Sequence, residues 1–559
     1  MRAMRRPEQL LHTQRVPAAL LHASTLLLLR DRPQGGWEVL MTRRSEHASF
    51  APNQYVFPGG GVEPQDAAAT EAVVRFRADM DQATRTAAVA ALRETFEEVG
   101  VLLAIHADGR AATQSDVQAL DRHAPLWPQL QAHGLRLDAS ALWQVGHFTA
   151  PAHIPKRFSV PFFVACMPEG QTPQPDHCEQ FEAVWVEPAA ALEPHPAQPM
   201  PMLRPTACTL HYLAPYPSVQ AILQAAAQGP WWRHAPRFGL LHGQPTWLLE
   251  HDRAYGEVAM VCPDGQVLHE LAWQSEQAVA LRKNILRLTA PNAHVMTGPG
   301  TNSYLVGEAE TGYIAIDPGP ADAAHVARLL DAAGGDVRSI VCTHSHADHA
   351  PGAFLLQALC VQRGLSKPLI YGLPSAPTAD AQSFFVPDAT LHDGACLRLE
   401  AGGGAARVTH TLRAIHTPGH AANHLCLLLE EDALLFSGDH ILNGSTTVVN
   451  PPDGNMQAYL ESLDLLAQWC QREAVEFLLP AHGYVLGQAS AVIAQLKQHR
   501  LAREAKVLAA MRQRPDGALQ DWVALAYADT PQNLWNWAER SLLAHVERIR
   551  ALGLLHVSD

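Results

Sequence analysis

Three histidines and one aspartate lie within the seven residues of THSHADH, from Thr343 to His349. The motif closes the apolar run SIVCT, and a strand followed by a tight loop would point these polar side chains to one place. Unpaired imidazoles are costly to bury, so this density indicates bound metal rather than a polar surface loop. Neutral imidazole suits Zn²⁺, and the neighbouring carboxylate suits a second metal ion.

Further residues of the same types follow at the ends of apolar strand patterns: His420 in HTPGH, Asp439 in FSGDH and His482 in LPAHG. The series resembles the metallo-β-lactamase superfamily, whose pattern is HxHxDH followed by His, Asp and His. Asp317 in YIAIDPG matches the early aspartate that usually orients the metal loop in that family. The resemblance implies a four-layer αβ/βα sandwich over residues 285–490.

The resemblance also implies two zinc ions and a set of ligands, matched position by position: His344, His346 and His420 for one ion, Asp348, His349 and His482 for the other, and Asp439 bridging both. Asp348 is expected to take part in catalysis as well. Such a metal pair lowers the pKa of a bridging water from about 15.7 toward about 7, which gives hydroxide at neutral pH. The hydroxide would attack an electrophilic carbon or phosphorus.

Three more histidines and one cysteine lie close to these positions. His424 in HAANHL either touches the substrate or ends a strand, and the sequence does not decide between the two. His416 and His440 flank predicted ligands and are expected to be structural. Cys342 lies on the strand before the motif and is expected in the core.

A second cluster places three glutamates in RETFEEVG, from Arg93 to Gly100. On a helix, Glu94, Glu97 and Glu98 share the face opposite an apolar stripe. Like charges at this spacing destabilise a bare helix, and a bound cation would remove that penalty. Carboxylate ligands favour Mg²⁺ or Mn²⁺, which also bridge to substrate phosphates. The alternative is a solvated acidic face.

RETFEEVGV resembles the core of the Nudix box, and FPGGG before it and EAVWVEP after it resemble the opening turn and the late strand of that family. The resemblance implies that the three glutamates hold the metal and act in catalysis. The standard Gly and Glu positions before the Arg are occupied by Asp79 and Arg85, so the loop carries an insertion. Glu63 or Glu71 would replace the missing glutamate, and the sequence does not choose between them.

The insertion and the segment MTRRSEHASFAPNQYVFPGG resemble the long-loop branch of the coenzyme A diphosphatases. This resemblance implies hydrolysis of a nucleoside-diphosphate-linked small molecule of the CoA type, with Mg²⁺ or Mn²⁺ as the cofactor.

Composition limits the remaining classes. The formal net charge of −14 gives no reason to expect nucleic-acid or membrane binding through bulk charge. Nine scattered cysteines indicate a reducing compartment, and no apolar run reaches the ~18 residues of a spanning helix. The sequence therefore predicts a cytoplasmic protein with no membrane partner. The run Ala18–Leu29 is expected as the first buried strand, because polar residues interrupt it.

The tail is locally basic, with six cations within eighteen residues: Lys497, Arg500, Arg503, Lys506, Arg512 and Arg514. Two further helical patterns and the strand-like GLLHV follow, which suggests a winged-helix domain. A lactamase core with this tail resembles the lactamase-β-like endoribonuclease group, which implies single-stranded RNA as a partner. The alternative is a plain solvated helix.

We therefore predict an α+β multidomain chain: a Nudix α/β/α sandwich at 1–205, a helical and β-hairpin connector at 206–284, a metallo-β-lactamase domain at 285–490 and a winged-helix tail at 491–559. The predicted function is bifunctional hydrolysis, of a diphosphate by the Nudix half and of RNA phosphodiesters by the zinc half. The alternative for the zinc half is a glyoxalase II-like or acyl-CoA thioesterase. The intact ligand sets disfavour a non-enzymatic sensor, and the sequence does not set the oligomeric state.

Overall fold

The chain forms two compact units, each described by itself. The structure, a computed structural model, describes residues 5–48, 50–193, 200–404 and 407–556. The smaller unit is Val16–Pro236, and the larger unit is made of Met1–Arg15 and Arg237–Asp559. In sequence, the smaller unit is therefore an insertion near the start of the larger one. No helix in the described ranges is long and apolar enough to cross a membrane.

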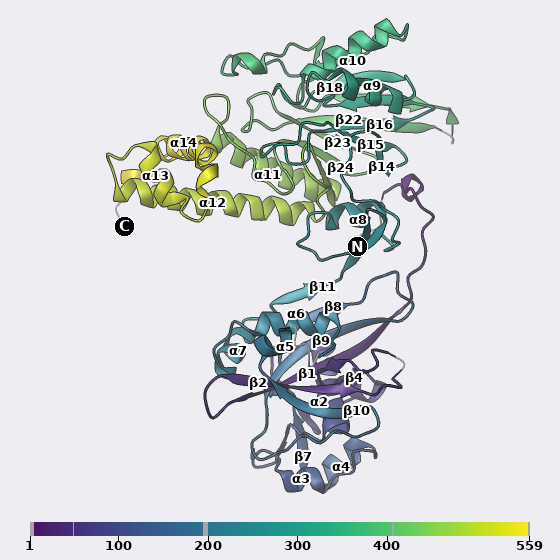
Figure 1. The fold of residues 1–559 in the computed structure, drawn as a ribbon, viewed down its shortest axis with the longest axis vertical. Coiled ribbons are helices and arrows are strands. Elements are labelled where there is room, and N and C mark those ends of the chain that lie inside the picture. The colour runs from purple at the N-terminus through teal and green to yellow at the C-terminus, as the bar shows by residue number, and fades with distance from the viewer. Residues whose placement is uncertain (1–4, 49, 194–199, 405–406, 557–559) are drawn as a thin grey trace. The chain divides into compact units, whose positions relative to one another are not determined.

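A mixed sheet forms the centre of the smaller unit (Figure 1). Its strands lie in the order β10 (Gln180–Val186), β2 (Trp37–Arg44), β1 (Leu20–Asp31), β9 (Arg157–Cys166), β8 (Trp143–Thr149) and β11 (Trp232–His234), with β3 (Tyr55–Val56) on β2 and β4 (Gly59–Gly61) on β1. β1 is the expected first strand. Because side chains alternate along a strand, Leu26 and Leu28 join the core of α2 (Gln82–Val99). Leu27 and Leu29 join that of α6 (Arg204–Leu213) and α7 (Val219–Ala226), which gives three layers.

The predicted insertion between β4 and α2 has regular structure. It contains α1 (Pro64–Ala67) and β5 (Val74–Arg75). β5 joins a small sheet with β7 (Leu135–Asp138) and β6 (Ala104–His106). The remaining helices of the unit are α3 (Gln114–Gln118), α4 (Leu126–Ala132) and α5 (Pro188–Leu192).

The predicted connector 206–284 is divided between the two units. In its first part, Leu210 and Ile222 are buried in the smaller unit's core, and β11 pairs with β8. Its second part belongs to the larger unit and contains the hairpin β12 (Arg237–Leu241) and β13 (Gln244–Leu248), followed by α8 (Tyr255–Val261). There the buried Glu257 accepts hydrogen bonds from Arg287 and from the Val485 N–H. An amphipathic pattern shows that a helix buries one face, but not which sheet covers it.

Two facing sheets between helical layers form the body of the larger unit. One has the order β14 (Val279–Arg282), β15 (Ile285–Thr289), β16 (Asn302–Glu308), β17 (Gly312–Ile316), β18 (Val337–Val341), β19 (Leu369–Gly372) and β20 (Ala389–Thr390). The other has the order β21 (Cys396–Ala401), β22 (Val408–His416), β23 (Leu425–Leu429), β24 (Leu434–Gly438) and β25 (Phe477–Pro480). One core lies between the sheets. The outer faces pack on α9 (Ala323–Ala332) and α10 (Pro351–Gln362), and on α11 (Met456–Glu473) and α12 (Ala489–Gln513). This confirms the predicted four layers.

The C-terminal helices form a small core of their own. α12 is joined there by α13 (Leu519–Ala526) and α14 (Trp535–Ala551), which lie at the yellow end of the chain in Figure 1. The strand expected in GLLHV is wrong for the residues described: Leu554–His556 form a 3-10 helix whose leucines pack on this core, and Val557 lies outside the described residues. A lone short strand would leave its backbone groups without partners, whereas a helical turn satisfies some of its own.

The first residues of the chain pack on the larger unit. A 3-10 helix, Pro7–Gln9, brings Leu10 into a buried position. The Lys283 N–H donates to the Gln9 carbonyl at 2.9 Å. The Arg6 guanidinium donates to the Thr409 carbonyl at 3.1 Å. This N-terminal segment thus completes the surface of a unit whose main body begins after Pro236.

Candidate functional site

The histidine motif forms the loop between β18 and α10. His344 Nε2 lies 3.0 Å from His346 Nδ1, and that atom lies 3.0 Å from His420 Nε2. Asp439 Oδ2 lies 3.5 Å from His420 Nε2. Ligand atoms of these four residues lie within 4.8 Å of one another, so the structure brings the first predicted set together.

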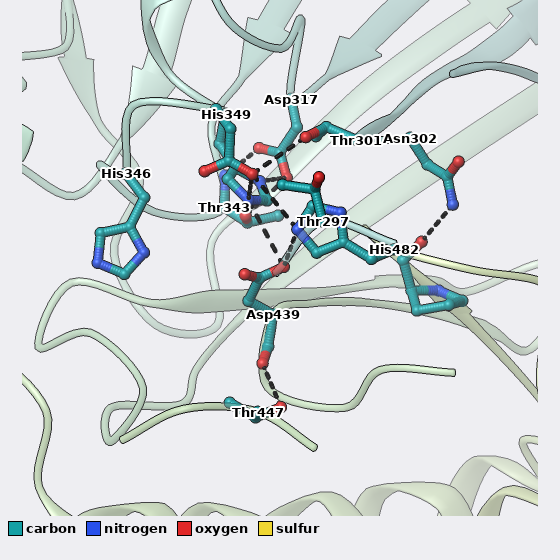
Figure 2. A network of polar contacts seen from close by, with 12 residues as sticks. Thr297, Thr301, Asn302, Asp317, Thr343, His346, His349, Asp439, Thr447 and His482 are labelled. Carbon is teal, nitrogen blue, oxygen red and sulfur yellow. Dashed lines mark hydrogen bonds and ion pairs between the residues drawn. The ribbon is translucent and has the colours of Figure 1, made fainter. Parts of the chain in front are cut away.

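Asp348, His349 and His482 form a second set within the same limit. Asp348 Oδ2 lies 3.3 Å from His349 Nε2 and 3.4 Å from His482 Nε2. Asp439 turns its other oxygen to this set, with Oδ1 3.5 Å from His349 Nε2 and 3.3 Å from His482 Nε2 (Figure 2). The two oxygens of Asp439 therefore face different sets, as a bridging ligand requires.

The centre carries orphaned buried atoms that a cation would satisfy. Nε2 of His349 and Oδ1 of Asp439 are buried and have no hydrogen-bond partner in the described part of the chain. Burial lowers the pKa of His420 to about 4, so its ring is neutral and able to ligate. Burial also acts against a charge on His349, but Asp348, Asp439 and Asp317 outweigh it and hold the pKa of that ring well above its usual value. This set of imidazoles and carboxylates fits two divalent metal ions.

Asp317, directly after β17, holds the histidine loop in place. Its Oδ1 accepts a hydrogen bond from the Thr343 N–H, and its Oδ2 accepts one from the Thr343 hydroxyl, each at 2.7 Å. Oδ2 also lies 3.0 Å from His349 Nδ1, which leaves Nε2 of that ring for the centre. Asp317 has a φ of 45°, which is uncommon for a residue other than glycine and is maintained here by these contacts. The structure thus gives Asp317 the orienting position that the resemblance implied.

His424 is buried behind the metal centre and supports one of its ligands. Its ring is fully buried, and its Nε2 accepts a hydrogen bond from the Asp439 N–H at 3.1 Å. Nδ1 lies 2.9 Å from the Thr417 hydroxyl, which fixes the ring. His424 therefore positions the backbone of the bridging aspartate. His440 is buried against the Tyr459 ring, which agrees with a structural role.

The loop after β24 supports two of the predicted ligands. His420 Nδ1 lies 2.7 Å from the Val448 carbonyl oxygen, a contact that leaves Nε2 for the centre. The Thr447 hydroxyl donates to the Asp439 carbonyl at 2.8 Å. One short segment thus orients a ligand of the first set and the ligand shared by both.

The C-terminal helices hold this loop from its other side. Arg500 of α12 is only 3% exposed and donates to the Thr447 carbonyl. The Ser541 hydroxyl of α14 accepts a hydrogen bond from the Val449 N–H at 3.5 Å. This role of Arg500 was not predicted from the sequence, because a cation on a helix is usually exposed to solvent.

Most of the predicted RNA-binding cations of the tail are already engaged with acidic groups. The pairs are Lys497 with Asp464 at 2.5 Å, Arg503 with Asp529 at 2.8 Å, Lys506 with Asp529 at 2.7 Å and Arg514 with Asp521 at 3.0 Å. The Arg512 guanidinium donates to the Leu554 carbonyl. The basic stripe of the sequence is therefore largely neutralised on the folded surface.

Replacing Arg500 with methionine is expected to weaken metal binding by about 10- to 100-fold, the usual cost of losing a group that orients metal ligands. The change removes the donor that holds the Thr447 carbonyl but keeps the apolar bulk. Metal affinity is to be measured by competition with a chromophoric chelator. Lys497→Met, on the same helix but at a surface ion pair, is the control and should bind metal as the wild type does. Equal affinity in both variants would remove Arg500 from this role.

One cleft connects the metal centre with the C-terminal helices. Its volume is about 640 Å³, within the usual range of small-molecule sites. Besides the ligands His346, Asp348, His420, Asp439 and His482, its lining includes apolar and aromatic side chains: Val295, Met296, Leu442, Val448, Tyr527, Leu534, Trp537 and Ala538. The tail therefore forms part of the wall of the site.

In the smaller unit, Arg93 organises the glutamate motif. Its guanidinium binds Asp66 through two hydrogen bonds of 2.9 and 3.0 Å, and it donates to Glu94 and Glu97 at 3.0 and 2.8 Å. Within the inserted loop, the carboxylate that pairs with Arg93 is thus that of Asp66, and Glu63 and Glu71 form no ion pair with Arg93. Glu63 instead lies at the start of α1, in a capping box with Asp66.

The three glutamates lie on one side of α2, but they do not form a fully solvated face. Glu98 is buried, and burial raises the pKa of its carboxyl to about 8 and that of Glu94 to about 7. A Cβ on Gly60 would lie 2.4 Å from the Glu94 carboxylate carbon, so the glycine turn closely approaches the motif. Among the described residues, the side chains that lie close enough together to share a metal ion are those of the metal centre. Glu94 and Glu97 do not form such a group with Glu98, because their carboxylates turn toward Arg93.

Two family models match parts of the larger unit. Residues 296–468 match the metallo-beta-lactamase superfamily, and residues 519–557 match the beta-lactamase associated winged helix domain. The beta-lactamase-like protein 2 homolog of Drosophila melanogaster is 31% identical over 284 residues, which is 50% of this chain and 91% of that protein. The atrochrysone carboxyl ACP thioesterase of Aspergillus chevalieri is 33% identical over 233 residues, 41% of this chain and 66% of that protein.

Among solved structures, a NUDIX hydrolase from Alicyclobacillus acidocaldarius matches with 28% identity and a TM-score of 0.34, over 37% of this chain and 96% of that one. A beta-lactamase domain protein from Burkholderia ambifaria matches with 21% identity and a TM-score of 0.41, over 51% of this chain and 90% of that one. With the ligand sets in place and most of the Drosophila protein covered, the chain is a hydrolase that belongs to the metallo-β-lactamase superfamily.

Proposed function

We propose that the larger unit is a dinuclear zinc thioesterase that acts on acyl thioesters of the CoA type. The observation that carries this proposal is the lining of the cleft, which includes apolar and aromatic side chains together with the predicted metal ligands. Such a wall suits an acyl chain, which gains by leaving water. Among the similar proteins, two are named as thioesterases, one from Aspergillus chevalieri at 33% identity and one from Emericella nidulans at 32%.

The residues of the metal centre have separate roles in the proposed hydrolysis. When bound, two metal ions would acidify a water and stabilise the oxyanion that develops on the carbonyl. Asp439 and the two histidine sets hold that pair, and Asp317 and His424 keep the ligands in place. In the loop after β24, Val448 keeps His420 turned inward and Thr447 holds the Asp439 backbone.

We propose that the smaller unit cleaves the diphosphate of a CoA-type molecule with Mg²⁺ or Mn²⁺ held by Glu94, Glu97 and Glu98. The sequence motif supports this, together with the close approach of Gly60 to Glu94. The two activities are chemically complementary, because one removes the acyl group and the other divides the carrier that remains.

Single-stranded RNA is the second proposed substrate of the metal centre. One observation favours it: Trp537 lines the cleft, and aromatic side chains are stacking platforms for bases. The pairing of the tail cations with Asp464, Asp521 and Asp529 speaks against it, since phosphate binding needs cations that are available.

A substrate panel tests the proposal. Zinc-loaded protein is incubated with acyl-CoA, S-acyl glutathione and single-stranded RNA, and the same panel is repeated with metal-free protein and with His344→Ala. We expect zinc-dependent thiol release that is lost in the variant. Absence of thiol release from both thioesters would reject the thioesterase, and RNA cleavage that requires His344 would establish the second candidate instead.

A further inference from the structure

We propose that Trp537 and Arg540, on α14, form a binding site for the phosphate of a phosphorylated pantetheine thioester. The proposal rests on the thioesterase function and specifies which substrates it prefers. Both side chains line the cleft that contains His346, Asp439 and His482. A substrate held at the metal centre by its thioester would therefore extend along the same cleft toward α14.

Arg540 differs from its basic neighbours in having an available guanidinium. Within the described residues it has no ion pair, whereas Arg503 and Lys506 share Asp529 and Arg548 binds Glu504. Its guanidinium carbon lies 4.5 Å from the centre of the Trp537 ring. Stacking of this kind orders the side chain before a ligand arrives, which lowers the entropic cost of binding.

The chemistry of the pair selects a phosphate rather than a neutral group. A guanidinium presents paired N–H donors that match the oxygens of a phosphate, and such charge-assisted bonds are stronger than neutral ones. His499 and Arg503 line the same cleft, but Arg503 is paired with Asp529 and burial lowers the pKa of His499, so neither competes with Arg540 as the cation for a phosphate. The pantetheine arm is uncharged, so its terminal phosphate is the group that Trp537 and Arg540 would bind. Coenzyme A and a pantetheinylated carrier protein both present that phosphate.

The decisive experiment compares thioesters that differ by one phosphate. KM and kcat are measured for octanoyl-pantetheine, octanoyl-4′-phosphopantetheine and octanoyl-CoA with the full-length zinc protein. We expect the wild type to favour the two phosphorylated substrates, and Arg540→Gln to raise their KM by about tenfold, the value of one charge-assisted hydrogen bond. KM for octanoyl-pantetheine and all kcat values should stay as they are, and Arg540→Lys should restore part of the loss.

Arg550→Gln is the matched control, because Arg550 also lies on α14 over a tryptophan, Trp522, but does not line the cleft. An equal KM for all three substrates in the wild type, or an Arg540→Gln effect that includes octanoyl-pantetheine, would overturn the phosphate site while leaving the thioesterase in place. If none of the thioesters is hydrolysed, the proposed function itself fails. The wild type could instead prefer octanoyl-CoA to octanoyl-4′-phosphopantetheine and lose this preference in Arg540→Gln. Arg540 would then bind the nucleotide end of CoA, and the proposed site for the pantetheine phosphate would be rejected.

Discussion

Asp439→Asn is expected to reduce kcat/KM at the metal centre by about 1,000-fold or more, since loss of a metal pair removes several kcal/mol of transition-state stabilisation. The oxygens of this carboxylate face both ligand sets, at 3.3 to 3.5 Å from His349, His420 and His482. An asparagine of the same shape keeps one oxygen and replaces the other with an NH₂ group, which cannot ligate. Metal content measured by elemental analysis should fall together with activity.

Asp331→Asn provides the control, because Asp331 is an exposed partner of Arg363 on the same unit. It should keep both metal and activity. A thermal melt adds a readout that does not depend on the substrate: zinc should raise the Tm of the wild type and of Asp331→Asn, because a ligand that binds the folded state stabilises it. Full activity with two bound metals in Asp439→Asn would refute the bridging role.

If the smaller unit acts as proposed, Glu98→Gln is expected to lower Mg²⁺-dependent release of phosphopantetheine from CoA by about 1,000-fold, through loss of a proposed metal ligand. Glu98 accepts hydrogen bonds from the Gly59 N–H at 2.9 Å and from the Gln180 side chain at 2.8 Å. Glutamine is close to it in shape, so the variant should fold. Hydrolysis at the metal centre should be unchanged, because that site belongs to the other unit.

Glu71→Gln is the control variant, because Glu71 is an exposed acidic residue of the inserted loop. It should behave as the wild type, which would also agree with Asp66 as the partner of Arg93. Undiminished CoA cleavage by Glu98→Gln would reject the Nudix assignment, and equal losses in both variants would indicate a general defect of the loop.

The metal centre was predictable because each ligand follows an apolar strand pattern, and strands of both sheets end at the same edge of the sandwich. The four-layer body was implied by the resemblance to the metallo-β-lactamase superfamily, and the first strand of the smaller unit follows from its apolar run. Asp66 was not predictable, because it lies within the insertion, 27 positions before Arg93, and sequence spacing gives no distance across a folded loop. Arg500 was misjudged because its burial depends on a loop that comes more than fifty positions earlier, at Thr447. GLLHV was misjudged because a short apolar run suits a strand or a helical turn equally well.

The N-terminal segment that packs on the larger unit has a consequence for synthesis of the chain. Residues 5–15 leave the ribosome before the smaller unit, but Lys283 and Thr409, which bind Gln9 and Arg6, are made only after the whole of it. During translation, the smaller unit can therefore fold while this segment waits unattached, and the segment docks late, as a closing step. A fragment that starts at Arg237 would lack it and leave its apolar contact site uncovered, so the halves are best separated by excising residues 16–236 and joining the two flanking ends.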